Sequence, residues 1–159
     1  MTTVRVQHAP FDVGAELALL DRLGGGAVAS FTGIVRGQGG LVELFLEHHP
    51  VMTAAALQRF VDEAEARWPL VGATVIHRCG ALAPGEAIVL VATASLHRAA
   101  ALDACAYLID RLKVAAPFWK RERFADGTER WVEARVEDDR AAASWQDQPS
   151  RAETRAVQR

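Results

Sequence analysis

Seven segments of the chain are rich in β-branched and aromatic residues, and in several of them apolar and polar positions alternate. This pattern predicts β-strands. The segments are residues 3–8, 27–36, 41–49, 72–80, 87–96, 117–124 and 129–136. We expect 27–36 and 41–49 to form a hairpin around the glycine-rich loop 37–40, and the last two segments to pair around the turn 125–128. Segment 87–96 is almost continuously apolar, which predicts a strand covered on both faces.

Apolar residues recur at helical spacing in two longer segments. The first helix is expected after Pro50, with Thr53 as its N-cap, and the second from about Leu96 to Leu112. The residues predicted to face inward are Leu57, Phe60, Val61, Ala64 and Trp68 in the first helix, and Leu102, Cys105, Ala106, Ile109 and Leu112 in the second. Two shorter helices, 12–22 and 138–145, are each expected to begin at an aspartate that can serve as N-cap.

Together these elements predict an α+β fold, in which a mostly antiparallel sheet carries two long helices. A chain of 159 residues has room for one domain with one sizeable core. We expect a single domain over residues 1–145. Residues 146–159 are polar and without pattern, which is typical of a disordered tail.

Composition narrows the class of protein. Half of the residues are hydrophobic and 24% are charged, and the net charge of −2 gives no general attraction to nucleic acid or to an anionic membrane. The chain does not begin with a signal-peptide pattern, and no apolar run approaches the ~18 residues that cross a membrane. Cys79 and Cys105 have no CxxC spacing and are expected to be reduced, buried thiols. These observations predict a cytoplasmic protein.

Only two of the 18 basic residues are lysines, and both, Lys113 and Lys120, lie in the short segment LKVAAPFWKRE. A bias toward GC-rich codons replaces surface lysines with arginine, except where the chemistry of the two differs. A lysine amine can give or take a proton, which arginine effectively cannot. Two structural explanations stay open, because Lys113 can complement a helix C-terminus and Lys120 can extend from a strand into solvent.

A proline corner between the two lysines favours a catalytic interpretation. Pro117 is expected to fold the following strand back near the end of the helix that carries Lys113. Two ammonium groups held close together repel, which favours the neutral amine of one of them and lets it act as a general base or acid. Arg121 and Arg123 add charge that attracts an anion.

Two further places suit an anion. His97 and Arg98 follow a buried strand and open a helix, with Ser95 as the expected N-cap, and a helix N-terminus offers unpaired backbone N–H groups. Arg36 ends an apolar strand and precedes a glycine-rich loop that lets a ligand approach the backbone. The simpler alternative in both places is a cation that points into solvent.

No metal or other cofactor is expected. His48, His49 and His77 have no spacing with a cysteine or carboxylate that is typical of a metal site. The sequence contains no P-loop, no GxGxxG and no GxSxG motif.

Six segments, in order along the chain, resemble the large, catalytic subunit of molybdopterin synthase. They are FTGIVR, LEHHPVMT, RWPLVGATVIHRCG, PGEAIVLVATASLHR, LKVAAPFWKRE and RWVEAR, and the likeness runs from about Ala27 to Trp145. The resemblance implies an α/β hammerhead fold with an added small antiparallel subdomain. It also implies a sulfurtransferase of molybdenum cofactor biosynthesis, which converts cyclic pyranopterin monophosphate to molybdopterin by building a dithiolene.

The resemblance implies protein partners as well. A small subunit with a ubiquitin-like fold would carry sulfur as a thiocarboxylate on its C-terminal Gly-Gly, and this tail would enter the pocket of the large subunit. Two large subunits would form a homodimer with a small subunit at each end, which makes a heterotetramer. The alternatives are a non-catalytic binding module for a phosphorylated ligand or acidic peptide, and a purely structural oligomer.

By position, the two active-site lysines of the family fall on Lys113 and Lys120. The substrate contacts that the resemblance implies fall on Ile34, Val35, Arg36, His97, Arg98, Arg121 and Glu122. The chain departs from the residues usual in the family, which are lysine, tyrosine, glycine and arginine, at Ile34, His49, Val51 and Ala115. These departures concern the details of substrate binding and not the class of reaction.

Overall fold

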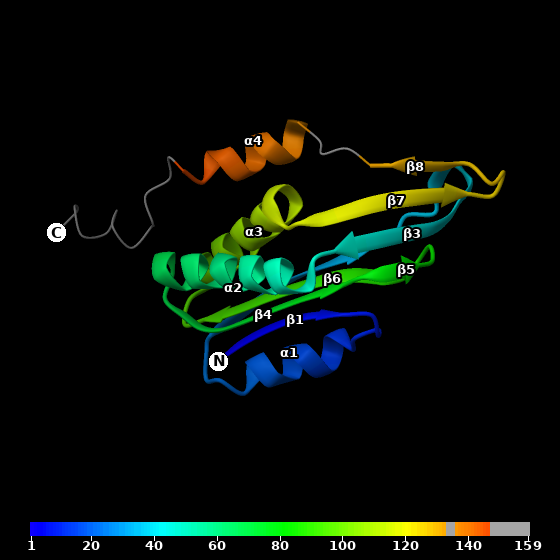
Figure 1. The fold of residues 1–159 in the computed structure, drawn as a ribbon. Coiled ribbons are helices and arrows are strands. Elements are labelled where there is room, and N and C mark those ends of the chain that lie inside the picture. Colours follow the sequence, from blue (N-terminus) through cyan, green and yellow to red (C-terminus); the bar gives the residue numbers. More distant parts are fainter. Residues whose placement is uncertain (133–135, 147–159) are drawn as a thin grey trace.

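The computed structural model describes residues 1–132 and 136–146, which form two four-stranded sheets with helices packed on them (Figure 1). The elements, in chain order, are β1 (Thr2–Gln7), α1 (Val13–Asp21), β2 (Ala27–Ile34), a 3-10 turn (Gln38–Gly40), β3 (Leu41–His48), α2 (Pro50–Arg67), β4 (Leu70–Arg78), β5 (Gly80–Leu82), β6 (Ala87–Ser95), α3 (Arg98–Ala115), β7 (Phe118–Phe124), β8 (Glu129–Trp131) and α4 (Val136–Ser144). This arrangement confirms the predicted α+β fold class. The predicted tail, 146–159, lies outside the described residues except for Gln146.

The first sheet has the strand order β1-β4-β6-β2 and supports most of the core. β1 runs parallel to β4, and the other pairs are antiparallel. On one face, Leu57 and Phe60 of α2 and Leu108 of α3 are buried with Val75 and Val91 of the sheet. α1 covers the opposite face of β6, so the prediction that this strand is covered on both faces is confirmed.

The second sheet has the order β5-β3-β7-β8 and is antiparallel throughout. It has a small core of its own, formed by Val35, Leu44, Leu46 and Leu82. β7 and β8 form the hairpin predicted around residues 125–128. In Figure 1 this sheet extends to the right, beyond the helices. It corresponds to the small antiparallel subdomain that the resemblance implies.

The predicted hairpin between segments 27–36 and 41–49 is wrong. β2 pairs with β6, whereas β3 pairs with β5 and β7, so the two segments belong to different sheets. The link between them contains the 3-10 turn, in which Gly39 and Gly40 adopt φ angles of 65° and 78°. Alternation identifies a strand with one buried face, but any strand with a matching face can become its partner.

The predicted N-cap of α2 is also wrong. The helix begins at Pro50 and is capped by His49, whose Nδ1 accepts a hydrogen bond from the Met52 amide at 3.4 Å. Proline suits the first helical position because the amide that it lacks would have no partner there. Thr53 lies inside the helix, fully buried, with its hydroxyl 3.2 Å from Nδ1 of His48.

The start and the inner face of α3 differ from the prediction. Ser95 still belongs to β6, where its hydroxyl donates to the Pro69 carbonyl at 2.8 Å, and His97 occupies the N-cap position. Leu102 is 59% exposed and Ala106 is exposed as well, so both face away from the core. The buried residues of α3 are Ala101, Ala104, Cys105, Tyr107, Leu108 and Leu112. In a helix this rich in alanine, the apolar pattern does not distinguish a core stripe from a neutral surface.

The two short helices differ in their caps. Asp12 caps α1 as predicted, because its carboxylate accepts a backbone amide proton of the first turn at 2.9 Å. α4 already begins at Val136, so Asp138 lies within the helix and is not its cap. α4 lies over α3 (Figure 1), and the indole N–H of Trp145 donates to the Asp110 carboxylate at 2.6 Å.

Candidate active site

A cavity of about 350 Å³ lies where the C-terminal end of α3 meets the start of β7. Strands β2, β6 and β4 of the first sheet supply its floor, and the end of α3 and the start of β7 supply its walls. The cavity is lined by Phe31, Thr32, Gly33, Ile34, Arg36, His77, Ile88, Val89, Ile109, Leu112, Lys113, Ala116, Phe118 and Lys120. Its volume is in the range of small-molecule sites.

Lys113 and Lys120 both line this cavity. Lys113 occupies the last turn of α3, and Lys120 lies in β7. Pro117 separates the two elements because it cannot continue the helix, and in the corner the Phe118 amide donates to the Ala116 carbonyl at 2.8 Å. β7 therefore turns back against the helix end, and the structure brings the two lysines to the walls of one cavity.

Successive residues of β7 point to opposite faces of the second sheet. Phe118 and Lys120 share the face that lines the cavity, and Lys120 lies opposite the buried Leu46 of β3. Trp119, between them, points to the other face and is largely exposed. The predicted division of this segment into two faces is confirmed.

Arg121 and Glu122 are engaged elsewhere in the second sheet and do not line the cavity. The guanidinium of Arg121 lies over the Phe45 ring at 4.9 Å, and its Nε is 3.9 Å from the Glu129 carboxylate. The Glu122 carboxylate is 3.4 Å from the guanidinium of Arg130. In this arrangement both residues stabilise the sheet that carries Lys120.

The end of β2 divides its three predicted site residues between two environments. Ile34 and Arg36 line the cavity. Val35 is 3% exposed and belongs to the core of the second sheet. Its amide donates to the Glu86 carbonyl and its carbonyl accepts from the Gly85 amide, both at 2.9 Å. The buried valine thus anchors the strand end and holds its two neighbours at the cavity.

His97 and Arg98 lie at the opposite end of α3 from the cavity. Both side chains are exposed, and neither lines the cavity. At about 1.5 Å of rise per residue, Arg98 and Lys113 are roughly 22 Å apart along the helix axis. Within one chain, His97 and Arg98 therefore cannot contact a small molecule that is held by Lys113 and Lys120.

His77 also lines the cavity, although its position in the sequence indicates only a weak candidate for a metal ligand. His77 lies opposite Val89, which lies opposite Gly33, so the three residues form one row across the floor. Nδ1 of His77 is 2.7 Å from the Arg78 carbonyl oxygen, and the ring stacks on Phe118 with centroids 3.9 Å apart. The signal in the sequence was a single titratable side chain within an otherwise uncharged strand segment, ATVIH.

The surroundings of His77 keep its ring neutral. Burial is the main cause that lowers the pKa of His77 from 6.5 to about 4. The hydrogen bond to the Arg78 carbonyl raises the pKa, but positive charge on Lys120, His48 and Lys113 lowers it further. At neutral pH the floor of the cavity therefore carries an uncharged imidazole beside two lysines.

The cavity suits an anionic ligand. Arg36, Lys113 and Lys120 are cationic, and among the described residues that line the cavity none is acidic. Guanidinium and ammonium groups donate hydrogen bonds to phosphate or carboxylate oxygens. A lysine amine can in addition transfer a proton to or from a reacting group.

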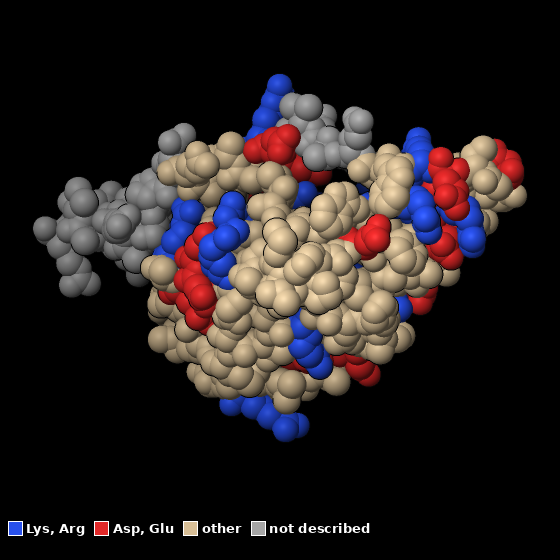
Figure 2. All heavy atoms as spheres, viewed as in Figure 1, with Lys and Arg blue, Asp and Glu red and all other residues tan. Residues whose placement is uncertain are grey.

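Charged side chains at the β7–β8 hairpin compensate one another. In Figure 2 basic and acidic residues alternate at the β7–β8 hairpin, whereas the middle of the same face carries few charges. The ion pairs of this hairpin are Arg121–Glu129, Arg123–Glu43 and Arg130–Glu122. The cavity therefore differs from the hairpin in that Arg36, Lys113 and Lys120 lie together in one lining, whereas the hairpin pairs its arginines with glutamates.

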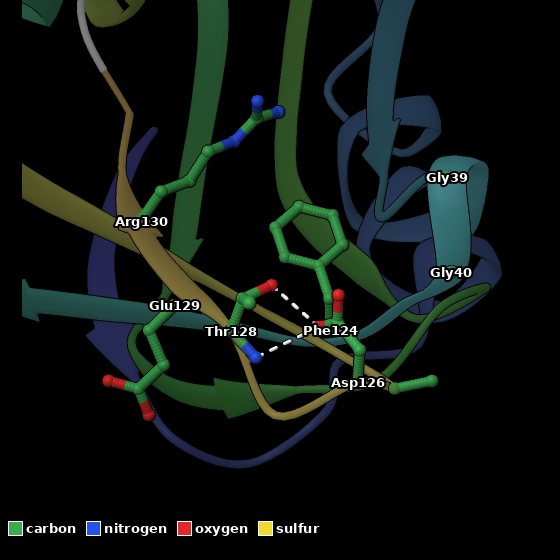
Figure 3. Close-up of a pocket in the computed structure, with 8 residues that line it drawn as sticks. Gly39, Gly40, Phe124, Asp126, Thr128, Glu129 and Arg130 are labelled. Carbon is green, nitrogen blue, oxygen red and sulfur yellow. Dashed lines mark hydrogen bonds between the residues drawn. The ribbon is translucent and has the colours of Figure 1, made fainter.

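A larger hollow of about 580 Å³ lies at the tip of the β7–β8 hairpin (Figure 3). It is lined by Gly39, Gly40, Phe124, Ala125, Asp126, Thr128, Glu129 and Arg130. The Asp126 carboxylate accepts hydrogen bonds from the amide and the hydroxyl of Thr128 at 2.9 and 2.6 Å, so it already serves the turn. No lysine or histidine is among the described residues of this lining. The smaller cavity is therefore the candidate active site.

Residues 1–132 and 136–146 contain neither a candidate metal site nor a candidate membrane-spanning helix. In these ranges, no group of three or more His, Cys, Asp or Glu side chains is arranged to hold a metal ion. No helix in the same ranges combines the length and the apolar character needed to span a membrane. Both cysteines are buried and free, as predicted.

Comparison with known proteins points to one family. The family model described as MoaE protein matches residues 6–115. A molybdopterin synthase catalytic subunit from Ralstonia nicotianae is 54% identical over 151 residues, which cover 91% of this chain and 85% of that protein. The solved structure of a molybdopterin biosynthesis MoaE protein from Burkholderia ambifaria MC40-6 is 44% identical, has a TM-score of 0.79, and covers 93% of this chain and 100% of that chain.

A more distant structure shares the fold. It is a protein–protein complex of subunits 1 and 2 of the molybdopterin-converting factor from Helicobacter pylori 26695, with 19% identity and a TM-score of 0.72 over 83% of this chain and 91% of that chain. At that identity the likeness concerns the fold alone. The family match and the closely similar relative carry the conclusion that this chain belongs to the MoaE family of molybdopterin synthase catalytic subunits.

Proposed function

We propose that this chain is the catalytic subunit of a molybdopterin synthase, a sulfurtransferase that converts cyclic pyranopterin monophosphate to molybdopterin. The observation that carries the proposal is that Lys113, Lys120 and Arg36 line one cavity of small-molecule size. Membership of the family supports the same activity, because a relative that is 54% identical to this chain is named a molybdopterin synthase catalytic subunit.

Each cation has a distinct part in the proposed reaction. Arg36 binds the phosphate of the substrate, for which the planar guanidinium is well suited. Lys113, at the exposed end of α3, assists the attack of the incoming sulfur on the pterin side chain and the later hydrolysis of the acyl–sulfur link. Lys120, which is half-buried, assists proton transfer during loss of water and ring opening. General acid–base assistance of this kind contributes about 10²- to 10⁴-fold.

The sulfur donor in this proposal is a small subunit with a ubiquitin-like fold. Its C-terminal Gly-Gly carries the sulfur as a thiocarboxylate, and a tail of two glycines is narrow enough to enter a cavity between helix and strand. The negative charge of the thiocarboxylate complements the cationic lining. The complex of two molybdopterin-converting factor subunits from Helicobacter pylori, one of which shares this fold, supports such a pairing.

We further propose that two copies of this chain form a homodimer, with a small subunit at each end. In the described part of the first sheet β2 is an outer strand, and Val28 and Ile34 on it are 38% and 49% exposed. An exposed apolar edge strand is a ready surface for pairing with another chain. A two-fold axis across this edge would set the two β2 strands antiparallel.

Such a dimer would give His97 and Arg98 access to an active site. The start of β2 lies beside the segment that leads into α3, because Ala27 pairs with Ser95. In an antiparallel pair of β2 strands, this region of one copy faces the strand end that carries Arg36 in the other. His97 and Arg98 of one chain would then bind the substrate that the lysines of the second chain hold.

A sulfur-transfer assay tests the proposed function directly. The purified chain is mixed with thiocarboxylated small subunit and cyclic pyranopterin monophosphate, and the product is followed by mass spectrometry. We expect a pterin with two added sulfurs. Binding of the pterin without any product would favour a non-catalytic binding module, and no affinity for the pterin would favour a structural oligomer. The cytoplasmic location stays a prediction.

A further inference from the structure

We propose that His77 is a substrate-contacting residue, whose Nε2 accepts a hydrogen bond from an N–H group of the pterin. The inference rests on the proposed function, and it assigns a binding role to a side chain outside the set of lysines and arginines. It concerns the recognition of the heterocycle rather than of the phosphate.

The position of His77 is suited to contact with a bound molecule. His77 lies on the floor of the cavity in the same row as Val89 and Gly33, and Gly33 has no side chain that would cover the floor. Stacking on Phe118, with an angle of 18° between the rings, fixes the plane of the imidazole. Lys120, two residues beyond Phe118, shares the cavity with it.

The hydrogen bond to the backbone determines which nitrogen is free for a ligand. A carbonyl oxygen only accepts, so Nδ1 of His77 must carry the proton that it donates to Arg78 at 2.7 Å. In a neutral ring Nε2 then has a lone pair and no proton. Nε2 is therefore the atom through which His77 can act on a molecule in the cavity, and it acts as an acceptor.

Few side chains can accept a hydrogen bond among the described residues of this lining. Arg36 has no acceptor, and neither have Lys113 and Lys120 in their charged forms. In residues 1–132 and 136–146, the side chains of the lining that can accept a hydrogen bond are Thr32 and His77. A pterin has N–H donors on its rings and an exocyclic amine, and a buried donor without a partner weakens binding. The neutral state of His77, with its pKa lowered to about 4, keeps the acceptor available at physiological pH.

Two substitutions of His77 test the proposal in the complex with the small subunit. His77→Phe keeps a flat ring against Phe118 and removes both nitrogens, whereas His77→Gln retains an amide that can donate to Arg78 and accept from a ligand. We expect His77→Phe to weaken binding of cyclic pyranopterin monophosphate, measured by calorimetry, on the order of tenfold. His77→Gln should recover part of this loss.

His48→Phe is the matched control. The His48 ring lies 5.6 Å from the Phe118 ring, but His48 is not among the residues that line the cavity. The control should bind the pterin within about twofold of the wild type, and thermal unfolding verifies that each variant is folded. Binding by His77→Phe that equals the control would overturn the proposal.

A measurement on the wild type covers the case in which His77→Phe does not fold. In protein labelled with ¹⁵N at histidine, the unprotonated Nε2 of His77 should shift when the pterin is added, because it gains a donor. An unchanged Nε2 resonance in a saturated complex would contradict the inference while leaving the proposed function intact. A wild-type complex that binds no pterin at all would instead overturn the proposed function, and this inference with it.

Discussion

The two ends of α3 carry the two main groups of candidate site residues, and their surroundings differ. At the C-terminal end, Lys113 lines a walled cavity together with Lys120 and Arg36. At the N-terminal end, His97 and Arg98 are exposed on the surface. One chain forms the cavity at the first end by itself, because β7 turns back against the helix. The second end becomes part of a site only if another chain covers it.

The largest effect is expected at the C-terminal end of α3. Lys113→Ala should reduce the rate of sulfur transfer by about 10²- to 10⁴-fold, because it removes a proton-transferring amine. Lys113→Arg should lose nearly as much, since it keeps the charge but cannot transfer the proton. Lys113 is exposed, so thermal unfolding should be nearly unchanged. Near wild-type rates for Lys113→Ala and for Lys120→Ala would show that the lysines are not catalytic.

Mixing two inactive variants tests whether the N-terminal end of α3 serves a second chain. If Arg98 binds the substrate across the proposed dimer, Arg98→Ala should reduce sulfur transfer strongly, because a charge-assisted contact to the substrate is lost. When Lys113→Ala and Arg98→Ala chains are mixed and allowed to exchange, the mixed dimer contains one site with both residues intact. Activity should then reappear above that of either variant alone. Mixtures that stay inactive despite confirmed exchange would mean that Arg98 does not act across the dimer.

His77 is buried near one end of α3, and His97 is exposed at the other end, so the two should affect the pH dependence of stability differently. The pKa of His77 is lowered from 6.5 to about 4, so between these values the unfolded chain binds a proton that the folded chain does not. The contribution of His77 to the free energy of unfolding should be fully present above pH 6.5. It should fall by roughly 3 kcal/mol as the pH drops to 4. Lys113 of α3, Lys120 of β7 and His48 of β3 are the charged or titratable groups that act on the His77 ring, and each lowers its pKa.

Denaturant unfolding at a series of pH values measures this loss. His77→Phe should flatten the decline between pH 6.5 and 4, because the group responsible is gone. His97→Phe, which alters an exposed histidine, should leave the decline as it is in the wild type. An identical acid slope in the wild type and in His77→Phe would mean that burial of His77 is not its cause.

The smallest effect is expected at the hollow near the hairpin tip. Asp126→Ala removes the carboxylate that organises the β7–β8 turn, far from both ends of α3. Sulfur transfer should stay within about twofold of the wild type in the standard assay. A loss as large as that of Lys113→Ala would assign this hollow, and not the smaller cavity, to the reaction.

Local pattern was a good guide to the elements and a poor one to their partners. The alternation in β7 correctly separated Phe118 and Lys120 from Trp119, because a strand directs successive side chains to opposite faces. The same kind of pattern led to a wrong hairpin, since nothing in segment 27–36 indicates that its partner is β6. In α3, alanines made the buried stripe ambiguous, and Leu102 proved to be exposed.

The candidate site was predictable where one short segment contains it. Lys113 and Lys120 stand out by residue type, and Pro117 between them marks the point at which the helix must end. His77 could not be assigned to the cavity from its position, because it lies far from the lysines in the sequence. Its role depends on the pairing of β4 with β6 and on the stack with Phe118.

Residue type and spacing thus determine the chemistry that this chain can offer: two amines beside a proline corner, and cations at the ends of a strand and a helix. Tertiary structure decides which of these groups meet. It brings Arg36 and His77 to the lysines, whereas the distance between Lys113 and the pair His97 and Arg98 already follows from the helix that the sequence predicts between them. The physical reason is that periodicity and turn chemistry act over a few residues, whereas a cavity forms only where strands and helices distant in sequence pack together.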